Sequence, residues 1–520
     1  MTERGNKGSP ASEGESRTAG MHVVEESDCV VVPMKLPNNE REQLAREAEV
    51  VEGSTQSKEN ISEIHTSPTQ SGKGVSRVSD SFGGLAGVRQ VARERKQEKF
   101  TALLHHVTVE LLRASFHALK REAAPGVDGV TWESYEDGLE DRLRDLHSRV
   151  HRGSYRAQAS RRIYIPKADG RQRPIGIAAL EDKIVQQAVV TVLQEIYETD
   201  FRGFSYGFRP GRGAHDALDA LSVGIFRKRV NWILDADIRG FFDHLSHEWL
   251  LQFVQHRVAD KRMLRLIQKW LKAGVSEAGQ WAETKEGTPQ GAVVSPLLAN
   301  VYLHYVFDLW VEQWRNRQAR GDVIVVRYAD DLVVGFEHRK EAERFLKEFG
   351  ERLAKFGLEL HPEKTRLIEF GRYAEANRKA RGEGDPETFA FLGFTHRCGT
   401  DRLGQFVIWR QSERKRLEAK LQEVKQALRA RMHEPVAQVG EWLSRVLRGY
   451  YNYHGVPGNR ASLNRFRERT MGYWWRVLAR RSQRGRLKVD RMKQLAARYI
   501  PLPRTMHPYP QLRFDAKHPS

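Results

Sequence analysis

Cysteine is almost absent from this sequence, and long apolar runs are missing. Only Cys29 and Cys398 occur in 520 residues, which excludes a disulfide framework and a zinc site built from paired cysteines. No run of 18 apolar residues occurs, and the first ten residues, MTERGNKGSP, contain no apolar signal core. We therefore expect a soluble protein of a reducing compartment, with no membrane span.

Aromatic residues are missing from one part of the chain. Residues 1–81 contain no Phe, Trp or Tyr, although the whole chain has 22 Phe, 11 Trp and 15 Tyr. This part is rich in Ser, Glu, Gly and Lys, a composition that buries too little apolar surface to fold. We predict a largely disordered extension over residues 1–85, in which the apolar segment 29–36 is a candidate docking segment.

Positive charge is in excess and is concentrated near one end. The formal net charge is +19, and residues 401–520 hold 27 Lys and Arg against 9 Asp and Glu. Aromatic residues are interleaved with these cations, at Trp409, Trp442, Trp474, Trp475 and in the run GYYNYHG (449–455). Cations that neutralise phosphates, beside rings that stack on bases, are typical of nucleic-acid binding. The alternative for the same cations is a solvated helical face.

The pattern of apolar residues divides the chain into a mixed part and a helical part. Apolar positions at three- and four-residue steps begin near residue 86 and predict helices. Between residues 160 and 410, short β-branched runs alternate with such helical patterns, and the remainder is mostly helical in pattern. A chain of 520 residues that is 40% apolar is long enough for more than one domain. We predict the α+β class.

Two adjacent aspartates stand between short apolar runs in VIVVRYADDLVVGF (323–336). The runs predict a β-hairpin with Asp330 and Asp331 at its tip. Neighbouring carboxylates repel each other and are costly to bury without a partner, so a bound cation such as Mg²⁺ would explain the pair. The alternative is a polar turn, and only a third acid elsewhere would favour the metal.

A third carboxylate is available in WILDADIRGFFDHL (232–245). Asp235 and Asp237 project from the same face of a predicted strand, and each is a candidate ligand. Asp235 has the alternative of pairing with an arginine, and Asp243 that of capping the next helix. One acid from the strand and two from the hairpin would form a trio that holds two Mg²⁺ ions. Such a pair of ions stabilises both the attacking and the leaving oxygen of a phosphoryl transfer.

Six sequence blocks occur together along the chain. They are IPKADGRQRPIGI (165–177), DADIRGFFD (235–243), TPQGAVVSPLLANVYL (288–303), YADD (328–331), FGLELHPEKT (356–365) and FLGF (391–394). In this order they resemble the blocks of reverse transcriptases, specifically those encoded by bacterial group II introns, and the resemblance extends from about residue 86 to the end. It implies a right-hand polymerase fold, with fingers at about 86–232, a palm at 233–408 and an α-helical thumb at 409–481.

The resemblance assigns roles at the reaction centre. It implies that Asp237, Asp330 and Asp331 are the catalytic ligands of two Mg²⁺ ions. It also implies that Phe242 is the ring that leaves no room for a 2′-hydroxyl, so that dNTPs are preferred over rNTPs. On residue type alone, a core position for Phe242 is favoured over the gate.

The resemblance also implies contacts to the nucleotide. Lys167 and Arg173 match the clamp on the triphosphate, and Gln290 matches a residue that contacts the incoming nucleotide. Lys364 matches a lysine that protonates the departing pyrophosphate. The block FLGF (391–394) resembles a primer-grip hairpin, although its residues could equally belong to a core.

Two further blocks resemble segments that are particular to group II intron proteins. APGVDGVTWESY (124–135) resembles an additional N-terminal finger segment, and residues 442–481 resemble the maturase, or X, domain, a thumb that also binds intron RNA. The RNA-binding residues expected there are Tyr450, Tyr451, Trp474 and Trp475. Residues 482–520 have neither the cysteines nor the length of the HNH endonuclease that many relatives carry. Only a short, basic DNA-binding remnant is expected in them.

The function implied is that of an RNA-directed DNA polymerase which also acts as a maturase, helping its intron RNA to splice and copying it into cDNA during mobility. The expected partners are intron RNA, an RNA template with a DNA primer, dNTPs and target DNA, in a ribonucleoprotein of the bacterial cytoplasm. One alternative is an RNA-binding splicing cofactor without polymerase activity, against which the intact acids argue. The other is a host-domesticated reverse transcriptase in repair or defence.

Overall fold

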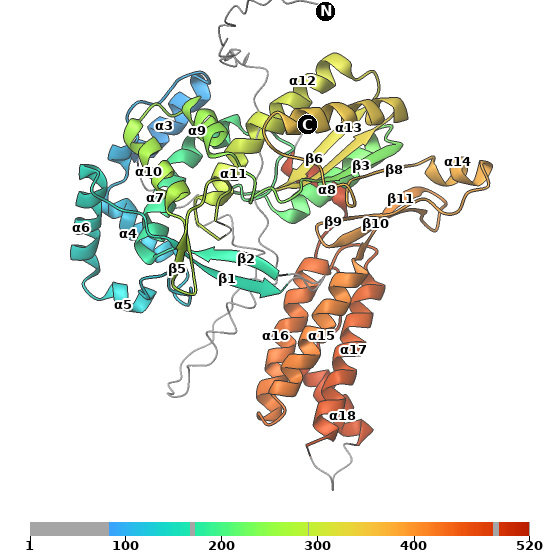
Figure 1. Ribbon diagram of the computed structural model, residues 1–520. Coiled ribbons are helices and arrows are strands. Elements are labelled where there is room, and N and C mark those ends of the chain that lie inside the picture. Colours follow the sequence, from blue (N-terminus) through green and yellow to red (C-terminus); the bar gives the residue numbers. More distant parts are fainter. Residues whose placement is uncertain (1–82, 167–171, 290, 482–487, 519–520) are drawn as a thin grey trace, which may run out of the picture.

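The computed structural model describes residues 83–166, 172–289, 291–481 and 488–518. Figure 1 shows a body of mixed helices and strands, from which a bundle of long helices extends in orange and red. The predicted α+β class is therefore confirmed. The expectation of disorder for residues 1–85 falls almost entirely outside the described residues. None of the described helices combines the length and the apolar character needed to cross a bilayer.

The fingers are built around helix α7 (Leu180–Asp200), which buries polar as well as apolar side chains. Its side chains are almost all buried, as expected for a helix that is surrounded by others. Helices α3 (Gly83–Glu94) and α4 (Val109–Ala118) pack directly against it. A four-stranded sheet has the strand order β2-β1-β4-β5. The other elements here are α5 (Trp132–Glu136), α6 (Leu139–Arg152), β1 (Ser160–Pro166), β2 (Gln172–Ile177), α9 (His247–Gln255), α10 (Lys261–Lys272), β4 (Val275–Glu277) and β5 (Gln280–Ala282).

The palm sheet has the strand order β6-β7-β3-β8, and its neighbouring strands are antiparallel. Its side chains alternate between two faces. Leu234 and Val334 join the large core that also contains α7, whereas Ile233 and Val333 join a second core with α8. The palm elements are α8 (Ala214–Arg227), β3 (Trp232–Asp237), α11 (Ser295–Leu303), a π-helix (His304–Asp308), α12 (Leu309–Gln318), β6 (Val323–Tyr328), β7 (Asp331–Phe336), α13 (Arg339–Ala354), β8 (Arg366–Glu369) and α14 (Ala374–Ala380).

A three-stranded sheet of order β11-β10-β9 connects the palm to the thumb. Strands β9 (Phe389–Phe391) and β10 (Phe394–Thr400) are joined by the turn Leu392–Gly393, and β11 (Phe406–Ser412) leads into the thumb. Both turn residues have positive φ, 49° and 79°, as a type I′ hairpin turn requires. The hydroxyl of Tyr453 donates to Leu392 O at 2.7 Å, so this turn is tied to a thumb helix.

The thumb is a bundle of four helices with a core of its own. Its helices are α15 (Arg414–Ala430), α16 (Val436–His454), α17 (Arg460–Ala479) and α18 (Val489–Tyr499). Helix α18 contributes Met492, Leu495 and Tyr499 to this core. Helix α18 buries its apolar face against the same bundle, so this core extends past residue 481, where the thumb was expected to end.

After α18 the chain returns to the palm. Helix α19 (Pro510–Lys517) lies against α8, where Arg513 pairs with Asp219 at 2.9 Å. Residues 488–518 thus join thumb and palm, and the DNA-binding remnant expected over 482–520 stays a prediction. Helix α8, which was expected in the fingers (86–232), packs on palm strand β6.

Candidate active site

Two of the three predicted ligands face each other across the palm sheet. Strand β3 pairs with β7 in a register that places Asp237 directly opposite Asp331. Opposed residues point to the same side of a sheet, with Cβ atoms about 4.5–5.5 Å apart. Both acids are partly exposed because they stand at the ends of their strands. Two like charges in this arrangement repel each other, so the pair favours a cation.

Asp330 lies in the turn that joins β6 to β7. Tyr328 and Asp331 are the last paired residues of the two strands, which leaves Ala329 and Asp330 as the turn. Ala329 has a φ of 63°, in the left-handed region that residues other than glycine rarely adopt. The predicted hairpin with both acids at its tip is confirmed, and it contains the kind of strained backbone that clusters at functional sites.

Lys364 reaches the same site from the loop before β8. Its Nζ contacts Asp237 Oδ2, and its side chain is 51% exposed. The loop is anchored on the strand that carries the acid, because His361 N donates to Asp237 O at 2.8 Å. The structure therefore brings Lys364 to the acids, while its role in proton transfer stays a prediction.

A buried ion pair that the sequence analysis missed lies under the hairpin. Arg327 belongs to β6, and its Nε donates to Asp308 Oδ1 at 2.6 Å, with both side chains 0% exposed. Asp308 ends the π-helix, a rare element that is frequent at functional sites. Burial raises the pKa of the Asp308 carboxyl, and the Arg327 guanidinium opposes that rise. The signal in the sequence was an arginine within an apolar run, since a buried charge requires a partner.

Phe242 follows β3 and is 7% exposed. Its carbonyl accepts a hydrogen bond from Thr288 N at 2.9 Å, which joins it to the TPQG block. A Cβ at Gly287 would lie only 2.6 Å from Phe242 O, so the two segments are in close contact. The burial of Phe242 is typical of a core residue, whereas its position beside the TPQG block suits a sugar gate. The role of Phe242 as a sugar gate therefore stays a prediction.

The strand that carries Arg173 abuts the same block. Arg173 is half-buried on β2. Further along that strand, a Cβ at Gly176 would lie 3.1 Å from Pro289 Cβ, which shows how closely the strand and the block approach. Lys167 and Gln290 lie outside the described residues, so their nucleotide contacts stay predictions.

The three acids suit a hard divalent cation by their chemistry. Mg²⁺ prefers carboxylate oxygens and is usually held by one or two of them, together with phosphates and water. Asp237, Asp330 and Asp331 offer such oxygens in partly exposed positions. In the part of the chain that the structure describes, no three His, Cys, Asp or Glu side chains converge as a complete metal site. The chemistry of these carboxylates suits Mg²⁺, but the binding of two ions by the three acids stays a prediction.

The thumb aromatics do not lie where the sequence analysis expected them. Tyr450, Tyr451 and Trp474 are 8%, 4% and 0% exposed and belong to the thumb core, and Trp475 is half-buried at its edge. Rings enclosed in this way have little surface on which bases could stack, and an RNA-binding role for the three buried residues stays a prediction. Exposed cations cover the outside instead, among them Arg445 and Arg448 of α16.

Comparison with known proteins identifies the region that contains these acids. The family described as reverse transcriptase (RNA-dependent DNA polymerase) matches residues 165–396. Protein YkfC of Escherichia coli (strain K12) is 36% identical over 240 residues, which cover 40% of this chain and 62% of that protein. The group II intron-encoded protein LtrA of Lactococcus lactis subsp. cremoris is 32% identical over 287 residues, which cover 54% of this chain and 47% of LtrA.

A second protein named for an intron is also similar. An uncharacterized 91 kDa protein in the cob intron of Schizosaccharomyces pombe is 40% identical over 156 residues, which cover 30% of this chain and 19% of that protein. The chain spans less than two thirds of the length of each of these relatives. Residues 165–396 therefore match the reverse transcriptase family, and parts of the chain are similar to intron-encoded proteins.

Proposed function

We propose that the protein is an RNA-directed DNA polymerase that extends a DNA primer on an RNA template. The observation that carries the proposal is the opposition of Asp237 and Asp331 across the sheet, with Asp330 in the adjacent turn. This arrangement gathers carboxylates at a partly exposed strand end, where a triphosphate can approach from solvent. The match of residues 165–396 to the reverse transcriptase family supports the same activity.

In this proposal the three acids hold two Mg²⁺ ions, which would supply charge stabilisation for the attacking and leaving oxygens. The primer 3′-hydroxyl attacks the α-phosphate of the dNTP, and pyrophosphate leaves. Lys364, whose Nζ contacts Asp237, is near enough to the acids to donate a proton to that leaving group. Arg173, together with Lys167 and Gln290, binds the nucleotide, and Phe242 excludes the 2′-hydroxyl.

We further propose that the thumb binds structured RNA through its exposed cations. Arg445, Arg448, Arg465 and Arg476 project from the outside of α16 and α17. The similarity to LtrA, which is named a group II intron-encoded protein, supports intron RNA as the partner. The protein would then also act as a maturase and copy its intron into cDNA at a DNA target, within a ribonucleoprotein of the bacterial cytoplasm.

Primer extension on an RNA template with Mg²⁺ and dNTPs tests the polymerase proposal. Asp331→Asn removes one ligand charge and should abolish extension while leaving RNA binding in place. Asp235→Asn is the matched control, because Asp235 lies on β3 two residues before Asp237 and on the same face, but forms an ion pair with Arg366 at 3.9 Å. Extension by Asp331→Asn at the wild-type rate would overturn the assignment.

A splicing assay separates the polymerase from a pure RNA-binding cofactor. If the wild-type protein promotes splicing of an intron RNA but extends no primer, the cofactor alternative holds. If it extends primers but binds intron RNA no better than an unrelated RNA of equal length, the maturase proposal fails and a domesticated reverse transcriptase is favoured.

A further inference from the structure

The loop that begins at Gly287 and leads into helix α11 is held at both ends by hydrogen bonds. At its first end, Gly287 N donates to Leu245 O at 2.7 Å and Thr288 N donates to Phe242 O at 2.9 Å. In the middle, Pro289 and Gly291 press against β2, since a Cβ at Gly291 would lie 2.9 Å from Gly176 O. We refer to residues 287–294 as the TPQG loop.

The second end of the TPQG loop is held by a side chain from the fingers. Gln186 of α7 is 3% exposed, and its Oε1 accepts hydrogen bonds from Val293 N at 2.9 Å and Val294 N at 3.4 Å. These two amides lie just before the first turn of α11, where backbone donors have no partner within the helix. Gln186 thus caps α11 from another helix, 107 residues away in sequence.

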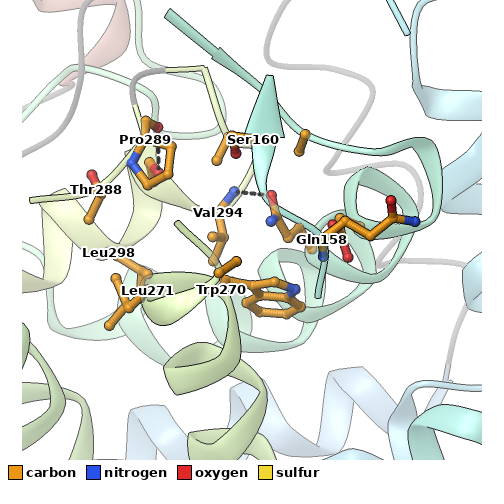
Figure 2. Close-up of a pocket in the computed structure, with 14 residues that line it drawn as sticks. Gln158, Ser160, Trp270, Leu271, Thr288, Pro289, Val294 and Leu298 are labelled. Atoms are coloured by element: carbon orange, nitrogen blue, oxygen red, sulfur yellow. Dashed lines mark hydrogen bonds between the residues drawn. The ribbon is translucent and has the colours of Figure 1, made fainter. Parts of the chain in front are cut away.

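Water cannot easily take the place of Gln186 as the acceptor for these two amides. Figure 2 shows Thr288, Pro289 and Val294 on one side of a small pocket, Gln158 on the other, and Trp270 below. Val294 is 2% exposed, so water has little access to its amide if the glutamine is removed. An unpaired buried donor is costly, and the backbone would have to move to satisfy it.

We propose that Gln186 is a positioning residue for the nucleotide site: it fixes the TPQG loop against β2 and Phe242, and thereby sets the affinity for the incoming dNTP. Gln186 does not itself touch substrate in this proposal. The inference rests on the proposed polymerase activity, and it adds that a fingers helix controls the geometry of the loop next to the sugar gate.

A pair of variants at one position isolates the hydrogen bond. Gln186→Met keeps the length of the side chain but removes the acceptor, whereas Gln186→Glu keeps an acceptor oxygen. Gln194→Met is the control, since Gln194 is a buried glutamine of the same helix whose Oε1 has no hydrogen-bond partner among the described residues. All are made in the full chain, and thermal unfolding establishes that each is folded.

Steady-state kinetics of dNTP incorporation on a primed RNA template give the first readout. We expect Gln186→Met to raise the KM for dNTP about tenfold, or about 1.4 kcal/mol, with a much smaller change in kcat. Gln186→Glu should restore a KM near that of the wild type, and Gln194→Met should not change it. A KM that is unchanged in folded Gln186→Met, or raised equally in Gln194→Met, would overturn the proposal.

Hydrogen exchange of the peptide that contains Val293 and Val294 gives a second readout, which needs no activity. We expect faster exchange of this peptide in Gln186→Met and not in Gln194→Met. Unchanged exchange would refute the proposal even if the enzyme is active. A wild-type protein that extends no primer would instead refute the polymerase activity, and the exchange experiment would still decide whether Gln186 holds the loop.

Discussion

The palm and the thumb differ in how they use the residues that point to function. In the palm, the acids stand partly exposed at a strand end and a turn, and Lys364 is in contact with Asp237. In the thumb, the aromatic residues that suggested base stacking are enclosed in the bundle, and arginines cover its outside. A carboxylate cannot be buried cheaply without a partner, so its position is informative, whereas an aromatic ring serves a core as well as a binding surface.

The largest effect is expected from removing both acids of the hairpin tip. Asp330→Ala with Asp331→Ala should lower primer extension roughly 10³-fold or more, since several kcal/mol of transition-state stabilisation depend on such ligands. The free energy of unfolding should stay the same or rise slightly, because repulsion with Asp237 is relieved. Activity and urea unfolding are measured on the same samples. A large loss of stability would show that these acids are structural, and the contrast with the thumb would disappear.

A thumb ring should behave in the opposite way. Trp474 is 0% exposed, so Trp474→Ala should lower the free energy of unfolding by about 3–5 kcal/mol through the cavity that it leaves. Trp475→Ala, at the edge of the same core, should cost only about 1 kcal/mol. Chemical denaturation measures both. Equal small costs, accompanied by loss of RNA binding in Trp474→Ala alone, would restore the base-stacking interpretation.

The features that could be predicted from the sequence depend on residues that are close together in the sequence. The hairpin with two acids at its tip follows from two short apolar runs on either side of adjacent charges, and it was found as expected. The pair Arg327–Asp308 and the bond from Gln186 to Val293 join residues 19 and 107 positions apart, and only the fold reveals such partners. Helix α18 was missed although Met492, Leu495 and Tyr499 have helical spacing.

The junction between palm and thumb should respond to acid. Burial lowers the pKa of His454 to about 3, with a smaller contribution from Arg416, and lowers that of His215 to about 2, followed by His507. In the unfolded chain these groups bind a proton near pH 6.5, so the folded state is fully favoured above that pH and loses stability as pH falls below it. Each histidine contributes a loss of about 1.4 kcal/mol per pH unit until its folded pKa is reached.

Unfolding measured between about pH 6.5 and pH 4.5 tests this dependence. His454→Gln should lose about 2 kcal/mol less stability than the wild type over this interval, whatever its absolute stability. His433→Gln, at an exposed thumb position, should follow the wild-type slope. Parallel slopes for all three proteins would mean that acid acts elsewhere and that His454 does not couple the thumb to the palm.

The smallest effect is expected from cations on the thumb surface. It tests whether these cations, rather than the thumb aromatic residues, bind RNA. The affinity for RNA should fall with the logarithm of salt concentration, with a slope of about −0.7 to −0.9 per neutralised phosphate. Arg445→Ala with Arg448→Ala should therefore flatten the slope for intron RNA by about 1.5, if each contacts one phosphate. Lys340→Ala with Lys347→Ala removes two exposed cations from α13 of the palm and should leave the slope unchanged. If the palm pair flattens the slope and the thumb pair does not, the RNA-binding surface lies on the palm side, and the thumb serves only to hold the primer and template.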